Sequence, residues 1–159
     1  MSKIITAYFS ATGTTAKVAE KVAAASGSDI FEIRPEKPYS AADLKWVNPL
    51  SRCNKEKIGR KDVPISRTIA NFSDHDIFLI GFPIWYYGAP NIIGTFLKQY
   101  DFSGKKIALF ATSGGSNIGK TADKLKPLLS DTAEIVDAKL FPHDVSEEAV
   151  REWLAKLNI

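Results

Sequence analysis

The sequence predicts a doubly wound α/β fold, in which a five-stranded parallel sheet carries helices on both faces. Five apolar, strand-like runs occur along the chain, and segments with a helical period lie between most of them. This alternation implies βαβ crossovers and hence parallel strands. The nearly continuous apolar character of 77–80 and 107–111 agrees, because strands covered on both faces are buried on both sides.

The apolar pattern of the sequence places the five strands and the first helix. We predict the strands, in order, at 3–9, 29–33, 76–82, 106–112 and 133–141. The first helix follows Gly13 and occupies 14–26, where Val18 and Val22 lie one turn apart. Gly27 lies just past its end and marks the stop.

Three later segments are expected to be helical. One opens at Pro90 and places on one face Ile92, Ile93, Phe96, Leu97 and Tyr100. The next spans about 117–129, and Pro127 should bend or shorten it. The last occupies 146–157, with an apolar stripe around Trp153 and with Glu147 and Glu148 near the positive end of its dipole.

Residues 36–64 form the long connection. This segment shows little periodicity apart from a short turn at 41–47, and we expect it to border the ligand site. Its basic part, RCNKEKIGRK at 52–61, is interpreted as a solvated loop, because nucleic-acid binding would need interleaved aromatic residues or a recognition helix. Cys53 is the only cysteine, so an intrachain disulfide is excluded and a free thiol in a surface loop is expected.

Bulk properties limit the classes of protein. With 159 residues, 45% of them hydrophobic and 25% charged, the chain is expected to form a single domain, 1–159. No apolar run approaches the roughly 18 residues of a membrane span, and no secretory signal opens the sequence. A cytoplasmic protein is the default expectation. His75 and His143 are interpreted as surface or packing residues rather than catalysts.

Ligands of open parallel sheets bind beyond the carboxyl ends of the strands. After the first strand, SATGTT at 10–15 supplies a glycine and four hydroxyls, from Ser10, Thr12, Thr14 and Thr15. Backbone N–H groups at a helix start, together with hydroxyl donors, suit a phosphate dianion. Four hydroxyls in six residues exceed what helix capping needs, so the sequence predicts a phosphate-binding loop here.

Two further loops offer a flat aromatic surface and a backbone segment that a ligand can approach closely. In PIWYYGAP at 83–90, Trp85, Tyr86 and Tyr87 cannot all point inward, so at least one should present a flat face to a ring. In TSGGS at 112–116, two glycines allow close approach of the backbone to a ligand. The neighbouring hydroxyls of this third loop supply hydrogen bonds.

A nucleoside-triphosphate site is the competing interpretation of SGGSNIGKT at 113–121. From Gly114 this string fits G-x-x-x-x-G-K-T and follows an apolar run. Such a site also needs a later strand that ends in a magnesium-binding aspartate, and Asp137 lies inside its run instead. Lys120 and Thr121 are therefore interpreted as first-turn residues of the next helix.

The three loops together resemble those of the flavodoxin family. S-A-T-G-T-T resembles the family's S-x-T-G-N-T phosphate loop, and P-I-W-Y-Y-G with T-S-G-G-S is similar to the two flavin-ring loops of the shorter, bacterial-type members. The resemblance covers essentially the whole chain. It implies the strand order 2-1-3-4-5, FMN as the cofactor, and low-potential electron transfer between a reductase donor and a protein acceptor.

The resemblance also implies the site residues. Trp85 is the candidate for stacking on the flavin, the backbone at 85–87 for the N5 edge, and 113–116 for the pyrimidine edge. The cofactor-binding residues are predicted to be Ser10, Ala11, Thr12, Gly13, Thr14, Thr15, Pro83, Ile84, Trp85, Tyr86, Tyr87, Gly88, Thr112, Ser113, Gly114, Gly115, Ser116 and Gly119. No catalytic side chain and no metal ligand are expected, because the isoalloxazine performs the redox chemistry. A monomer that binds neither nucleic acid nor membrane is expected.

Three departures from the family pattern leave a second function open. Tyr86 stands where many members have glycine, TSGGS lacks the tyrosine that often covers the other flavin face, and the sequence pI is about 8.9 where electron carriers are typically acidic. The alternative is an FMN-dependent NAD(P)H or quinone reductase that acts on small molecules. A flavin-binding module without redox turnover is a third reading.

Overall fold

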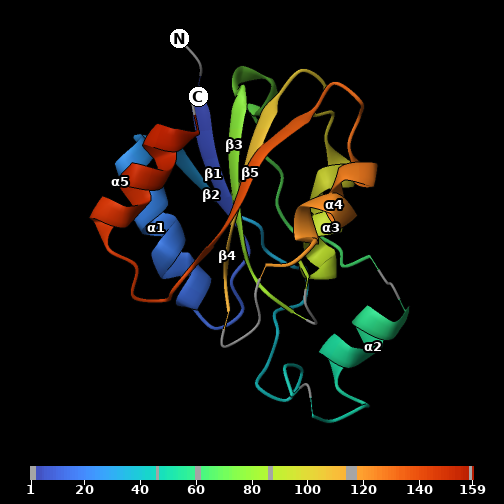
Figure 1. Ribbon diagram of the computed structural model, residues 1–159. Coiled ribbons are helices and arrows are strands. Elements are labelled where there is room, and N and C mark those ends of the chain that lie inside the picture. Colours follow the sequence, from blue (N-terminus) through green and yellow to red (C-terminus); the bar gives the residue numbers. More distant parts are fainter. Residues whose placement is uncertain (1–2, 46, 60–61, 86–87, 114–117, 158) are drawn as a thin grey trace.

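A five-stranded parallel sheet forms the centre of the protein (Figure 1). The computed structural model describes residues 3–45, 47–59, 62–85, 88–113, 118–157 and 159. The strands are β1 (Ile4–Tyr8), β2 (Asp29–Glu32), β3 (Ile77–Pro83), β4 (Lys106–Thr112) and β5 (Glu134–Phe141). They are all parallel and follow the order β2-β1-β3-β4-β5. The predicted fold class and strand order are confirmed.

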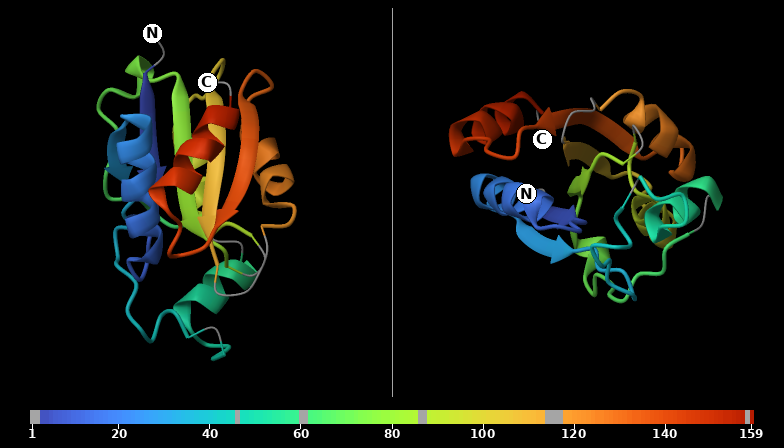
Figure 2. Two further views of the ribbon diagram at one scale, coloured as in Figure 1. Left: turned by 60° about the vertical axis from the view of Figure 1, so that its left-hand side comes forward. Right: turned by 90° about the horizontal axis from the view of Figure 1, so that it is seen from below.

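Helices cover both faces of this sheet (Figures 1 and 2). In chain order they are α1 (Thr14–Ser26), α2 (Arg52–Gly59), α3 (Asn91–Gln99), α4 (Thr121–Leu125) and α5 (Glu147–Lys156). Two short 3₁₀ segments, Phe72–Asp74 and Lys126–Leu128, complete the set. One face carries α1 and α5, and the other carries α3 and α4.

The central strand β3 shows why both faces are buried. Its residues Phe78, Ile80 and Phe82 belong to the core that includes α3, whereas Ile77 and Leu79 belong to the core that includes α1 and α5. Successive side chains of a strand point to opposite faces, so an uninterrupted apolar run fills two layers. Burial of each such side chain contributes about 1.5–3 kcal/mol.

Most element boundaries agree with the sequence-based ranges. The ranges of α1 and β4 are those predicted, and the other strands differ by one residue at one or both ends, which is within the usual scatter of boundary assignment. The helix predicted at 117–129 is shorter, because α4 ends at Leu125 and Pro127 lies in the following 3₁₀ turn. Proline lacks the N–H that a continued α-helix needs.

The basic segment differs from its prediction, because residues 52–59 form helix α2 and not a loop. A polar contact stabilises the helix: Arg52 Nε donates to Glu56 Oε2 at 3.0 Å across one turn. The expectation of a surface thiol is also wrong, since Cys53 faces inward with 5% of its area exposed.

The two histidines lie as expected for residues outside the site. His75 is fully buried, and its ring nitrogens lie within hydrogen-bond distance of the Asn71 carbonyl (3.1 Å) and Asp29 Oδ2 (3.0 Å). It therefore packs at the amino end of β3. His143 is exposed in the loop after β5. None of the helices in the described part of the chain combines the length and apolar character needed to cross a membrane.

Candidate functional site

The loops that follow β1, β3 and β4 meet at Thr112, the last residue of β4. The hydroxyl of Thr112 lies 2.8 Å from that of Thr15, at the start of α1, and both side chains are buried. The carbonyl of Thr112 accepts a hydrogen bond from the Ile84 N–H at 2.8 Å. The structure thus brings the three predicted ligand loops together at one edge of the sheet.

The first loop, 10–15, leaves the start of α1 open to an anion. Gly13 is the N-cap residue and has φ 92°, a conformation that glycine adopts readily and that side-chain-bearing residues avoid. In the described structure no side chain caps α1 and no acidic residue lies in its first turn. The free N–H groups of a helix start and its positive dipole end attract anions, so the loop suits a phosphate group.

The four hydroxyls of this loop divide into two pairs. Ser10 Oγ accepts a hydrogen bond from the Gly13 N–H at 3.0 Å, and Thr15 bonds to Thr112, so these two residues hold the loop in shape. Thr12 and Thr14 are exposed and remain the hydroxyls that face solvent. Ala11, between Ser10 and Thr12 in the sequence, packs against the core.

In the second loop, the backbones of Trp85 and Gly88 exchange two hydrogen bonds of 2.8 and 3.0 Å. Pro83, Ile84 and Trp85 are half-buried. Gly88 is buried. The predicted contributions of Tyr86 and Tyr87 lie outside the described residues.

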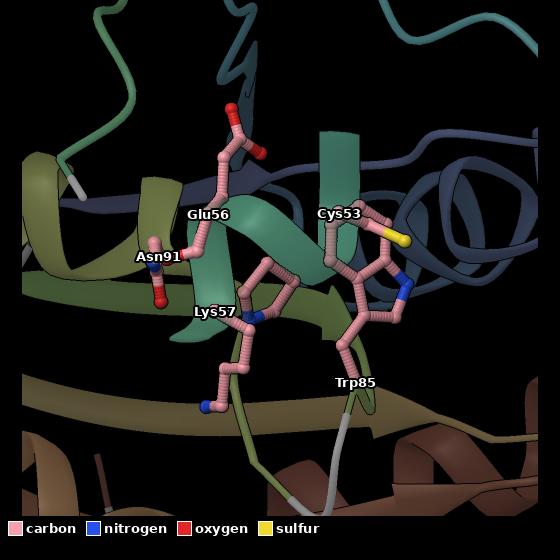
Figure 3. Close-up of a pocket in the computed structure, with 6 residues that line it drawn as sticks. Cys53, Glu56, Lys57, Trp85 and Asn91 are labelled. Carbon is pink, nitrogen blue, oxygen red and sulfur yellow. Dashed lines mark hydrogen bonds between the residues drawn. The ribbon is translucent and has the colours of Figure 1, made fainter. Parts of the chain in front are cut away.

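Trp85 packs against parts of the chain that sequence reasoning did not connect with it. Its ring makes edge-to-face contacts with Phe9 (centroids 5.6 Å apart) and with Tyr39 (5.4 Å). On the side of α2 it lines a small hollow with Cys53 and Lys57 (Figure 3). The tryptophan predicted to stack on the flavin is therefore held rigidly, with only part of its surface accessible.

Tyr39, in the long connection, fixes this arrangement and was not predicted. Its hydroxyl donates to Glu56 Oε1 at 2.5 Å, and the Arg52 guanidinium carbon lies 3.9 Å from the centre of its ring. Burial, and then the bond to Glu56, raise the pKa of Tyr39. No local pattern marks Tyr39, because its partners lie on α2 and beyond β3. The long connection thus reaches Trp85.

The third loop is described only at its ends. Thr112 is buried and Ser113 is half-buried, whereas the predicted residues Gly114, Gly115 and Ser116 lie outside the described residues. Gly119 is exposed with φ 51°.

The structure does not support a nucleoside-triphosphate site at 113–121. Thr121 is the first residue of α4 and Lys120 immediately precedes it. The Thr121 side chain is buried, and its hydroxyl donates to the carbonyl of Ile118. A magnesium ion would need that hydroxyl to be accessible.

The sheet order and the loops at its carboxyl edge define a flavodoxin-like protein. A family model described as flavodoxin matches residues 3–157, and the chain belongs to this family. Family membership supports FMN as the cofactor, as the three loops predict. No functionally curated protein matches the sequence.

Solved structures agree with this assignment. An inferred flavoprotein from Bacteroides eggerthii is 41% identical, with 100% of this chain and 99% of that one covered and a TM-score of 0.93. An inferred flavoprotein from Bacteroides uniformis is 36% identical over 97% of this chain and 98% of that one, with a TM-score of 0.87. A flavoprotein from Lactobacillus acidophilus, solved in complex with FMN, is 24% identical over 97% and 99%, with a TM-score of 0.73.

Proposed function

We propose that this protein binds FMN at the carboxyl edge of its sheet and transfers electrons at low potential between redox partners. The observation that carries the proposal is the junction at Thr112, which ties the phosphate-type loop at 10–15 to the two loops expected around a flavin ring. The similar L. acidophilus protein, which shares the fold and was solved with FMN, supports the cofactor.

The first loop would hold the phosphate of FMN. The donors are the N–H groups in the first turn of α1 and the exposed hydroxyls of Thr12 and Thr14. Gly13 lets the chain turn into the helix with these groups facing outward. The absence of acidic residues from that turn in the described structure keeps the local potential favourable for a dianion.

The second and third loops would hold the ring. FMN, when bound, supplies the redox chemistry, and the protein sets its environment. The bond from Ile84 to Thr112 fixes the spacing between these two loops, and Trp85 offers its accessible surface to a planar group. The contacts of Trp85 with Phe9 and Tyr39 prevent the indole from turning away.

A second candidate function is an FMN-dependent NAD(P)H or quinone reductase. The observation that favours it is charge: the sequence carries a net charge of +3, whereas a carrier that docks on basic reductases is typically acidic. A positively charged surface suits anionic small molecules such as pyridine nucleotides.

FMN binding through the first loop is tested by comparing FMN with riboflavin, which lacks the phosphate. Titration of the purified protein, followed by flavin fluorescence, should show tighter binding of FMN. Replacing Gly13 by valine, which disfavours φ 92°, should weaken FMN binding about tenfold and leave riboflavin binding unchanged. Gly104→Val is the matched control, because Gly104 also has positive φ (75°) but precedes β4 at the opposite edge.

Equal affinities for FMN and riboflavin in the unaltered protein would refute the phosphate loop. The carrier and reductase functions are then separated by adding NADPH or NADH anaerobically to the FMN-loaded protein. A carrier keeps its flavin absorbance under these conditions until a partner reductase is supplied. Direct bleaching by NAD(P)H, with turnover when a quinone is added, would establish the reductase instead.

A further inference from the structure

A hollow of about 240 Å³ lies beside the second loop, between α3 and α4. Gly88 of that loop forms part of its wall, and the end of α2 closes one side. Three lysines from three different helices line it, Lys57 from α2, Lys98 from α3 and Lys124 from α4. A single carboxylate, that of Asp62, is also found in the described part of the lining.

This carboxylate is already paired. Lys98 Nζ lies 2.6 Å from Asp62 Oδ1, so these two charges offset each other. In the described residues no carboxylate lies within 4.0 Å of the ammonium group of Lys57 or Lys124. Among the described residues, the positive charges of Lys57 and Lys124, which lie on α2 and α4, therefore have no ion-pair partner at the hollow.

Lys57 is the more enclosed of the two. Its side chain is half-buried, and its Nζ would lie 3.9 Å from a β-carbon built on Gly88. Figure 3 shows its ammonium turned away from the carboxylate of Glu56, the preceding residue on the same helix. Burial and then the charge of Lys124 lower the pKa of Lys57. An anion placed between the two lysines would oppose both effects, because its negative charge stabilises the charged form of Lys57.

We propose that this hollow is a binding site for a small anion, the carboxylate or phosphate group of a small molecule, held by Lys57 and Lys124. The size of the hollow and the partial burial of Lys57 favour a compact ligand over the convex surface of a protein. The site goes beyond the proposed function, since its binding groups lie on α2 and α4 and not in the three flavin loops.

The positively charged residues of α2 have different roles. Arg52 contacts Glu56 and Tyr39 and stabilises the long connection. Lys57, five residues on, faces the hollow. The positive charge that the sequence concentrates in this segment is thus directed in part toward a ligand site.

The test uses FMN-saturated protein whose lysines have been reductively methylated with ¹³C-formaldehyde, which keeps their charge. The Lys57 signal is assigned by its loss in Lys57→Arg. Sodium pyrophosphate and sodium succinate are titrated separately at low salt. At least one should move the Lys57 signal saturably at millimolar or lower concentration and raise the pKa of Lys57. The stronger of the two identifies phosphate or carboxylate as the preferred group.

Lys124→Gln should weaken this binding about tenfold. Lys126→Gln is the matched control, because Lys126 is exposed two residues further on and does not line the hollow, so the affinity should stay within about twofold. Failure of both anions to move the Lys57 signal, or equal effects of the two substitutions, would overturn the proposal. Because the signal is local to Lys57, the result stands apart from FMN uptake, which is measured separately by absorbance.

Discussion

The hydrogen bond between the hydroxyls of Thr15 and Thr112 should contribute strongly to the stability of the loops at the carboxyl edge of the sheet. The two oxygens are 2.8 Å apart, and the residues are 1% and 3% exposed, so neither hydroxyl has water as an alternative partner. Replacing either threonine by valine keeps the shape and leaves the other hydroxyl unpaired. Each single substitution should lower the free energy of unfolding by about 1–3 kcal/mol.

The double variant should cost less than the sum of the two singles. With both hydroxyls replaced, no buried polar group is orphaned, so the coupling energy should be about 1–2 kcal/mol. Urea unfolding followed by circular dichroism measures all four proteins. Additive effects of the two substitutions would refute the reasoning, because they would mean that the two hydroxyls do not depend on each other.

A control separates stability from ligand binding. Thr6 is also buried, and its hydroxyl bonds to that of Ser28 at 2.7 Å, but it lies in the middle of β1. Thr6→Val should reduce stability by less, because Ser28 is half-buried and keeps its hydrogen bond with Ser26. It should leave FMN affinity unchanged, whereas Thr15→Val should weaken FMN binding because Thr15 shapes the first loop. Equal effects of the two variants on FMN binding would contradict the role assigned to the hydrogen bond between Thr15 and Thr112.

Two further predictions concern the core and the long connection. Gly81→Ala should destabilise the protein by about 1–3 kcal/mol or more, because the added β-carbon would lie 2.3 Å from the ring of Phe110. Urea unfolding should show that Phe110→Leu partly restores the lost stability. An unchanged urea midpoint for Gly81→Ala would contradict this packing. Tyr39 has its folded-state pKa raised by burial and by Glu56, so its contribution to stability is complete below the unfolded value of 10.0 and is lost as pH rises above it. The drop in urea midpoint between about pH 9 and pH 11 should therefore be smaller in Tyr39→Phe, and an identical drop would exclude Tyr39 as its source.

The elements that sequence analysis placed well are those with a local apolar pattern. Val18 and Val22 mark the buried side of α1 and Gly27 ends it with φ 65°, so the whole helix is encoded within its own residues. The run of β4 is equally self-contained, because every residue after Lys106 in that strand is buried. Such segments can be predicted from their own residues alone, without information about the elements that pack against them.

Helix α2 lacked this signal because polar contacts stabilise it. Cys53 is its one buried apolar residue, and Ile58 is 80% exposed, so no apolar stripe can be read from the sequence. Its stabilising partners are distant in the chain, such as Asn91, whose side-chain amide donates to the Glu56 carbonyl at 2.7 Å. Contacts of this kind depend on the completed fold.

The candidate site was predictable as a location and less so in its details. The rule that ligands bind at the carboxyl edge located all three loops, and the clustering of hydroxyls in SATGTT singled out the first. The sequence could not show that Ser10 and Thr15 bond within the protein while Thr12 and Thr14 face outward. Nor could it connect Tyr39 with Trp85, which are separated by more than a quarter of the sequence.

Because α2 is held mainly by polar contacts, the free energy needed to detach this helix does not depend on the free energy of unfolding the core. The helix stands outside the layers of the sheet (Figure 1), and its detachment would expose little apolar surface. A local opening of this kind has a small dependence on denaturant and a free energy below that of global unfolding. Access to Trp85 and to the lysine-lined hollow can therefore be adjusted by substitutions in α2 without a matching cost to the stability of the domain.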